Sequence, residues 1–127
     1  MANKTMTNLE IYAYANALRD AFKEDIMLPV RVNFYLQKNM TKLTEAAKEI
    51  EKARMEIIEK YGTPAEDGNG FQVSAEKVEI VNKELEDLFN LEQEIKVNEI
   101  TLDAFNDIEL TSSQVAAISF MIKDEEE

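Results

Sequence analysis

The middle of the chain carries a long run of apolar residues at helical spacing. Between residues 36 and 61 they recur every three or four positions, at Leu36, Met40, Leu43, Ala47, Ile50, Ala53, Ile57 and Tyr61. This period predicts one helix about 39 Å long at 1.5 Å per residue. Charged residues of both signs alternate on its other face, which is typical of a solvated surface. Gly62 and Pro64 end the helix, so we expect the fold to be built around this spine.

Three shorter helices are predicted around it. Thr7 and Glu10 form a capping-box pattern, which starts a helix over residues 8–22. Ser74 is a candidate cap for a helix over residues 75–89. Residues 102–105 fit a helical turn, and a last helix begins at Thr111 or Ser112.

Three segments are predicted to be strands. Val30, Val32 and Phe34 alternate with polar residues, which favours a strand over residues 30–34, although Pro29 also fits the start of a helix. Residues 71–73 and 94–99 are the other candidates. Together they predict a small antiparallel or mixed sheet.

The fold class expected is therefore α+β, mainly α, in a single domain. A length of 127 residues fits one core, and an apolar fraction of 45% is ordinary for a globular protein. We expect flexible ends at residues 1–7 and 123–127 and a loop at residues 62–70.

Composition disfavours several kinds of chemistry. The chain has no Cys and no His, so it lacks thiolate nucleophiles, the commonest general base and the commonest zinc ligand. Carboxylate pairs such as Glu84 with Asp87 lie away from the apolar stripe of their predicted helix, where solvated acids are the better interpretation. The sequence thus predicts no enzyme and no cofactor. It shows no apolar run of about 20 residues and no hydrophobic signal region at its start, so we expect a cytoplasmic protein away from membranes.

The charge is divided unevenly. Residues 1–63 hold 10 Lys/Arg and 9 Asp/Glu, a net of +1, whereas residues 64–127 hold 4 and 17, a net of −13. Such a surface repels nucleic acid phosphates and suits a basic protein partner. Glu84, Glu86 and Asp87 crowd one short helical stretch and are the predicted partner-binding residues.

Residues 65–76, AEDGNGFQVSAE, partly match a helix-loop-helix calcium loop. Asp67, Asn69 and Glu76 would occupy ligand places and Gly70 the turn. The first ligand place, however, holds Ala65, which removes a carboxylate. Turn dipeptides at 67–70 explain the same residues, so no metal site is predicted and these three remain weak candidates.

One resemblance covers about residues 8–122. The run LPVRVNFYLQKNMTKLTEAAKEIEKARMEIIEKYG, a Gly-containing turn, the helix KVEIVNKELEDLFNLEQEIKVNEI and a final short helix resemble a family of small uncharacterised proteins of tailed bacteriophages and prophages. The resemblance implies a biological setting in a bacterial host cell and supplies no catalytic residues.

The function expected is non-enzymatic. The favoured hypothesis is a phage-type protein that binds a host macromolecule, of the defence or replication machinery, through its acidic surface. A virion assembly accessory that associates with itself or with a structural protein is one alternative. An oligomeric sponge for a nucleotide signal is another, with phosphates held by Arg31, Lys38, Lys42 and Arg54.

Overall fold

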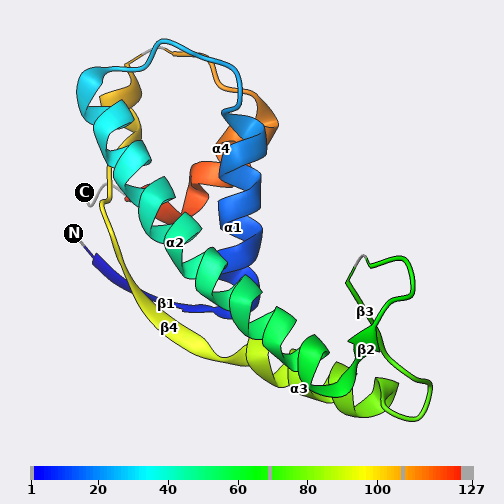
Figure 1. The fold of residues 1–127 in the computed structure, drawn as a ribbon. Coiled ribbons are helices and arrows are strands. Elements are labelled where there is room, and N and C mark those ends of the chain that lie inside the picture. The colour runs from blue at the N-terminus through cyan, green and yellow to red at the C-terminus, as the bar shows by residue number, and fades with distance from the viewer. Residues whose placement is uncertain (1, 69, 107, 124–127) are drawn as a thin grey trace.

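The computed structural model describes residues 2–68, 70–106 and 108–123 (Figure 1). The elements of this described part follow in the order β1 (Ala2–Thr7), α1 (Asn8–Ala21), α2 (Val30–Tyr61), β2 (Thr63–Pro64), β3 (Phe71–Gln72), α3 (Val78–Asn90), β4 (Glu92–Val97), the 3₁₀ turn η1 (Leu102–Phe105), α4 (Ser112–Ile118) and the 3₁₀ turn η2 (Ser119–Met121). The predicted class is confirmed: α+β, mainly α, around a long central helix.

Helix α2 is longer than predicted, and the strand expected over residues 30–34 is wrong. Pro29 is the N-cap, with φ −52° and ψ 146°, and its carbonyl oxygen accepts a hydrogen bond from the N–H of Asn33 at 2.9 Å. The helix therefore begins immediately after the proline. A proline at this position costs the helix no hydrogen bond, because the first N–H groups of a helix have no partner inside it.

The burial pattern explains why a strand fails. Val32 and Leu36 are 1% and 2% exposed, whereas Val30 and Phe34 are 86% and 56% exposed. In a strand, Val30, Val32 and Phe34 would share one face. A helix instead separates Val32 from the other two and places it with Leu36, which extends the buried stripe of the spine by one turn.

The main sheet has an unexpected partner strand. β1 pairs antiparallel with β4, with Ala2 opposite Val97 and Thr7 opposite Glu92. The strand predicted near residues 94–99 is thus present, but it pairs with the segment 1–7 that was expected to be a flexible end. Met6 on β1 and Val97 on β4 are 4% and 1% exposed, so burial of apolar side chains holds the pair against the core.

The segment 71–73 does not join this sheet, contrary to prediction. Among the described strands, β3 pairs with β2 alone, as a small hairpin at the far end of α2 (Figure 1). Gly62 permits this fold-back, since a Cβ there would lie 2.7 Å from the carbonyl oxygen of Ile58 and 3.1 Å from the Cβ of Phe71. The glycine is required by close packing as well as by its role as a helix stop.

Two of the three shorter helices, α1 and α4, begin where the sequence signals predict. Thr7 forms the predicted capping box with Glu10, and Thr111 forms another with Gln114. α3 begins later than predicted, at Val78, and its N-cap is Lys77 in place of Ser74. The N–H of Lys77 bonds to the carbonyl oxygen of Ser74, so Ser74 belongs to a turn that precedes the helix.

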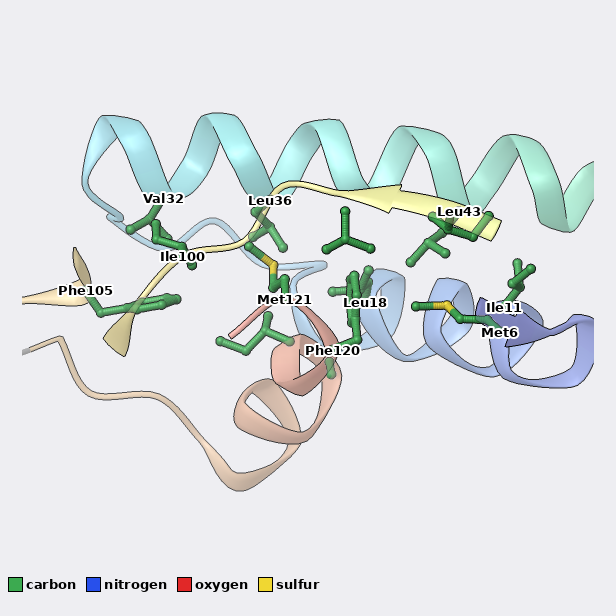
Figure 2. Packing of buried hydrophobic residues seen from close by; sticks show 14 of the residues in the cluster. Met6, Ile11, Leu18, Val32, Leu36, Leu43, Ile100, Phe105, Phe120 and Met121 are labelled. Atoms are coloured by element: carbon green, nitrogen blue, oxygen red, sulfur yellow. The ribbon is translucent and has the colours of Figure 1, made fainter. Parts of the chain in front are cut away.

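The core lies between the first half of α2, helix α1, the inner face of the sheet and the C-terminal turns (Figure 2). Leu43 is fully buried and Ile50 is 2% exposed, which confirms the spine. Phe120 and Met121 are 6% and 0% exposed and belong to this core, so they do not form a contact surface. The second half of α2 packs against α3.

One buried polar side chain joins three parts of the chain. Asn39 on α2 is 2% exposed. Its Oδ1 accepts from the N–H of Asn98 at 2.9 Å, and its Nδ2 donates to the carbonyl oxygen of Asn98 at 2.9 Å. Nδ2 also lies 3.5 Å from the sulfur of Met121. The carboxamide thus satisfies both main-chain groups of a buried residue just beyond β4.

Replacing Asn39 by Leu should therefore destabilise the protein strongly. The change leaves the N–H and the carbonyl of Asn98 buried without partners, at about 1–3 kcal/mol each, so the free energy of unfolding should fall by about 2–6 kcal/mol. Urea unfolding measures it. The control is Asn33→Leu, at an exposed position of the same helix. A loss below about 0.5 kcal/mol, as at ordinary surface positions, would contradict this role.

Candidate binding surface on the central helix

The four cations proposed for a ligand do not lie together. Lys38 and Lys42 follow Arg31 by seven and eleven residues. At 3.6 residues per turn, all three fall on one side of α2. Arg54 falls on the opposite side, with the buried residues. Within one chain, a single phosphate ligand therefore meets at most the first three of the predicted residues.

Large apolar side chains are exposed beside these cations. Val30 is 86% and Phe34 is 56% exposed, one helical turn apart, and Met27 just before the helix is 91% exposed. We define the cationic stripe as Val30, Arg31, Phe34, Lys38 and Lys42, on the first four turns of α2. Exposed apolar residues scattered singly are normal on a protein surface. Here they are neighbours on one helix face, next to fixed positive charge.

The three cations of the stripe each contact a neighbouring group. The Nζ of Lys38 lies 5.1 Å from the ring centroid of Phe34, and the guanidinium carbon of Arg31 lies 5.6 Å from that of Tyr35. Both are cation–π distances. The Nζ of Lys42 donates to the carbonyl oxygen of Lys96 at 2.8 Å. A shallow hollow of about 300 Å³ lies along the stripe, lined by Phe34, Gln37, Lys38, Thr41 and Lys42.

The local charge is opposite to that of the whole chain. Residues 26–44 contain three cations and no Asp or Glu, in a chain of net charge −12. The stripe therefore lies in a positively charged segment of an acidic protein. The sequence carried this signal as an acid-free interval, but a strand over residues 30–34 would have placed Val30 and Phe34 with Val32 in the core.

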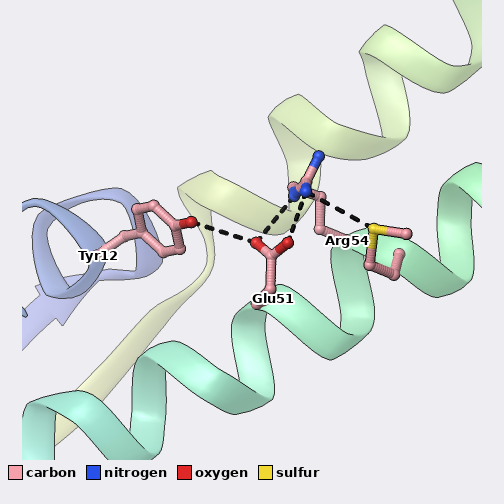
Figure 3. A network of polar contacts seen from close by, with 4 residues as sticks. Tyr12, Glu51 and Arg54 are labelled. Carbon is pink, nitrogen blue, oxygen red and sulfur yellow. Dashed lines mark hydrogen bonds and ion pairs between the residues drawn. The ribbon is translucent and has the colours of Figure 1, made fainter. Parts of the chain in front are cut away.

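Arg54 has a structural partner instead of a ligand (Figure 3). Its Nε donates to Glu51 Oε2 at 2.9 Å, and its second nitrogen donates to Oε1. The hydroxyl of Tyr12 on α1 donates to the same carboxylate at 3.2 Å. The hydrogen bond from Arg54 lowers the pKa of Glu51 from its ordinary value, and the carboxylate in turn raises the pKa of Arg54. A general acid would need a raised pKa, which is the opposite of what Glu51 has. The contacts of Glu51 with Tyr12 and Arg54 instead join α1 to α2.

The network makes a testable contribution to stability. Because the pKa of Glu51 is lowered on folding, its contribution is present above the ordinary pKa of a Glu, about 4.3, and is lost as the pH falls through the folded value. Glu51→Gln should lower the free energy of unfolding at pH 7 by up to about 1 kcal/mol, since both side chains are about a third exposed and solvent screens them.

The measurement is urea unfolding of wild type and variant at several pH values. The difference between them should shrink as the pH is lowered from about 5 to about 3. Glu56→Gln, at an exposed position of the same helix, is the control. A difference that persists unchanged at pH 3 would contradict the assignment.

The three predicted partner-binding acids have different surroundings on α3. Glu84 is turned toward the end of α2, where its carboxylate lies 3.6 Å from the Nζ of Lys60 and its side chain is 34% exposed. Glu86 and Asp87 are exposed on the outer side of α3. At about 100° per residue, Asp87 lies within about 60° of Glu84 around α3, whereas Glu86 lies about 160° away from Glu84. Of the three acids, Glu86 and Asp87 have exposed side chains, whereas Glu84 is partly covered and paired with Lys60.

The calcium-like residues lie on the hairpin and the turn that follows it. Asp67 is in the exposed tip, where Gly68 and Gly70 have φ of 77° and 76°, while Glu76 lies in the turn before α3. Asn69 lies outside the described residues. Among the residues that are described, no three acidic side chains gather closely enough to hold a metal ion.

Calcium should accordingly bind only weakly or not at all. Calorimetric titration of the purified protein should show no saturable binding below about 1 mM, the weak end of known extracellular sites. Saturable binding tighter than that, abolished by Asp67→Asn, would overturn this prediction.

No protein-family model, curated protein or solved structure matches this chain. The resemblance to phage and prophage proteins therefore stays a prediction. In the described ranges, no helix combines the length and the apolar character needed to cross a membrane.

Proposed function

We propose that the protein is a non-catalytic binding protein that docks an acidic segment of another protein on the cationic stripe of α2. The observation that carries this proposal is the exposure of Val30 and Phe34 beside Arg31 and Lys38, in an interval of the sequence without carboxylates. The segment it fits has one or two large apolar side chains flanked by Asp or Glu.

The stripe supplies both parts of such a contact. Phe34 and Val30 would be buried under the partner's apolar side chains, and apolar burial contributes roughly 25 cal/mol per Å². Arg31 and Lys38 would donate charge-assisted hydrogen bonds to the flanking carboxylates. Their guanidinium and ammonium groups already lie against aromatic rings. Less side-chain freedom is then lost on binding than for fully mobile cations.

The charge of the rest of the molecule favours one site over others. An acidic segment is repelled by a surface of net charge −12 and attracted where the charge is locally positive. The stripe is thus the place where such a partner approaches. Like charges elsewhere act against wrong contacts, which increases specificity.

A second candidate is the reverse arrangement, in which a basic partner binds the acidic half of the chain. It is favoured by the exposure of Glu86 and Asp87 on α3. The two candidates are distinguished by which residues the binding needs. A host protein as partner, virion assembly and a nucleotide sponge stay predictions from the sequence.

Selection from a random peptide library on the immobilised protein tests the proposal. Enriched peptides should combine a large apolar residue with Asp or Glu. Their dissociation constants should rise at least about tenfold, equivalent to about 1.4 kcal/mol, for Phe34→Ala and for Lys38→Glu. Two controls should leave binding within about twofold. Lys52→Glu makes the same charge change at an exposed position of α2, and Val115→Ala removes an exposed apolar side chain on α4.

Two results would overturn it. In the first, no peptide is enriched on wild type over a Phe34→Ala, Lys38→Glu double variant. In the second, enriched peptides are basic and lose binding with Glu86→Lys and Asp87→Lys, which supports the second candidate instead. Circular dichroism and thermal unfolding confirm that each variant is folded.

A further inference from the structure

The two outer edges of the β1–β4 sheet differ. In an antiparallel pair, successive residues direct their main-chain groups alternately toward the partner strand and away from it. Thr7 opposes Glu92, Thr5 opposes Glu94 and Asn3 opposes Lys96. These residues therefore belong to one class.

Two hydrogen bonds identify that class as the outward one. The N–H of Thr7 donates to Glu10 Oε1 at 3.0 Å, and the carbonyl oxygen of Lys96 accepts from Lys42. Neither group is thus used between the strands. The main-chain N–H and carbonyl groups of Asn3 and Thr5 consequently point away from β4, at the outer edge of β1.

The outer edge of β4 is closed along its second half and beyond. The carbonyl oxygen of Lys96 accepts from Lys42, and both main-chain groups of Asn98 bond to Asn39. The N–H of Ile100 donates to the carbonyl oxygen of Met121 at 2.9 Å, and its own carbonyl oxygen accepts from the N–H of Lys123 at 2.8 Å. Helix α2 and the C-terminal segment together satisfy this edge.

The outer edge of β1 has no equivalent cover in the part of the chain that the structure describes. β4 is the only described strand that pairs with β1. Natural edge strands are commonly protected by Pro, by a bulge or by charged side chains, Lys above all. β1 contains no Pro, and its register with β4 runs without a bulge from Ala2 to Thr7. Lys4 is the charged residue of β1, and its charge is paired, because its Nζ lies 3.5 Å from Glu99.

We propose that a second copy of the chain occupies this edge. The two β1 strands pair antiparallel, with Asn3 of one copy opposite Thr5 of the partner subunit, to give a continuous four-stranded sheet. Directly opposed residues of the outward class exchange both main-chain hydrogen bonds. Asn3 and Thr5 each find a partner on both sides of the two-fold axis, which passes beside Lys4.

Charge favours a second copy at this place over other faces. Two chains of net charge −12 repel each other, but the exposed side chains of this edge, Asn3 and Thr5, are uncharged. In the proposed register, Lys4 lies next to Lys4 of the partner subunit, at about 4.5 Å between Cα atoms. Each ammonium group keeps its own Glu99 at 3.5 Å, which offsets the repulsion between the two lysines. The two-fold axis makes the same residues meet on both copies.

Sedimentation analysis over about 1–500 µM protein tests the proposal, because dimerisation follows mass action. Wild type should show a reversible monomer–dimer equilibrium. Thr5→Pro removes an outward N–H and should weaken the dimer at least about tenfold, whereas Thr5→Val keeps the N–H and should change it less than about threefold. Lys4→Glu would gather four carboxylates at the two-fold axis and should weaken the dimer as strongly as Thr5→Pro. Lys52→Glu, the same charge change on α2, should not.

Amide hydrogen exchange gives a readout at single residues. The amides of Asn3 and Thr5 should become protected as the protein concentration rises, while those of Lys4 and Met6, which face β4, are protected at every concentration. This pattern also shows that β1 is folded in each variant. A protein that stays monomeric at all concentrations overturns the proposal. So does a dimer that Thr5→Pro and Lys4→Glu leave unchanged.

Discussion

The pairing of Asn39 with Asn98 is the interaction on which the remaining architecture depends. A carboxamide carries N–H donors and a carbonyl acceptor side by side, so it substitutes for the peptide group of a missing neighbouring strand. Asn39 lies in the core and is 2% exposed. An amide without hydrogen-bond partners there would cost free energy of folding. The bond fixes both the position and the rotation of α2 relative to the sheet. Met121 contacts the same carboxamide, so the C-terminal segment docks at this point as well.

The rotation of α2 determines what the protein presents to solvent. With Asn39 and Leu43 turned inward, Val30 and Phe34 lie on the opposite side of the helix, because each residue advances it by about 100°. Their exposure is thus a consequence of how the core is satisfied. The cationic stripe and the closed edge of β4 have a common origin, since Lys42 takes part in both. The same residues that complete the sheet also shape the surface proposed to bind a partner.

The sequence predicted what depends on local signals. The spine from Leu36 to Tyr61, the capping box at Thr7, the start of the last helix and the stop at Gly62 follow from period, cap chemistry and backbone geometry. Residues 30–34 are too few to separate a period of 2 from one of 3.6, so the first turn of α2 was assigned to a strand.

The partner of β4 and the cover of its edge depend on residues far away in the chain, which no local pattern encodes. The candidate site was only half predictable for a related reason. Arg31, Lys38 and Lys42 were named, but their separation from Arg54 and the exposure of Phe34 require the helical register and the core.

The order in which the strands are made adds a constraint on biosynthesis. β1 leaves the ribosome first, yet its partner β4 follows about 85 residues later, a delay of roughly 4–17 s at about 5–20 residues per second. Throughout that interval both edges of the nascent strand are unpaired, whereas the main-chain hydrogen bonds of α1 and α2 are local in sequence and do not wait for β4.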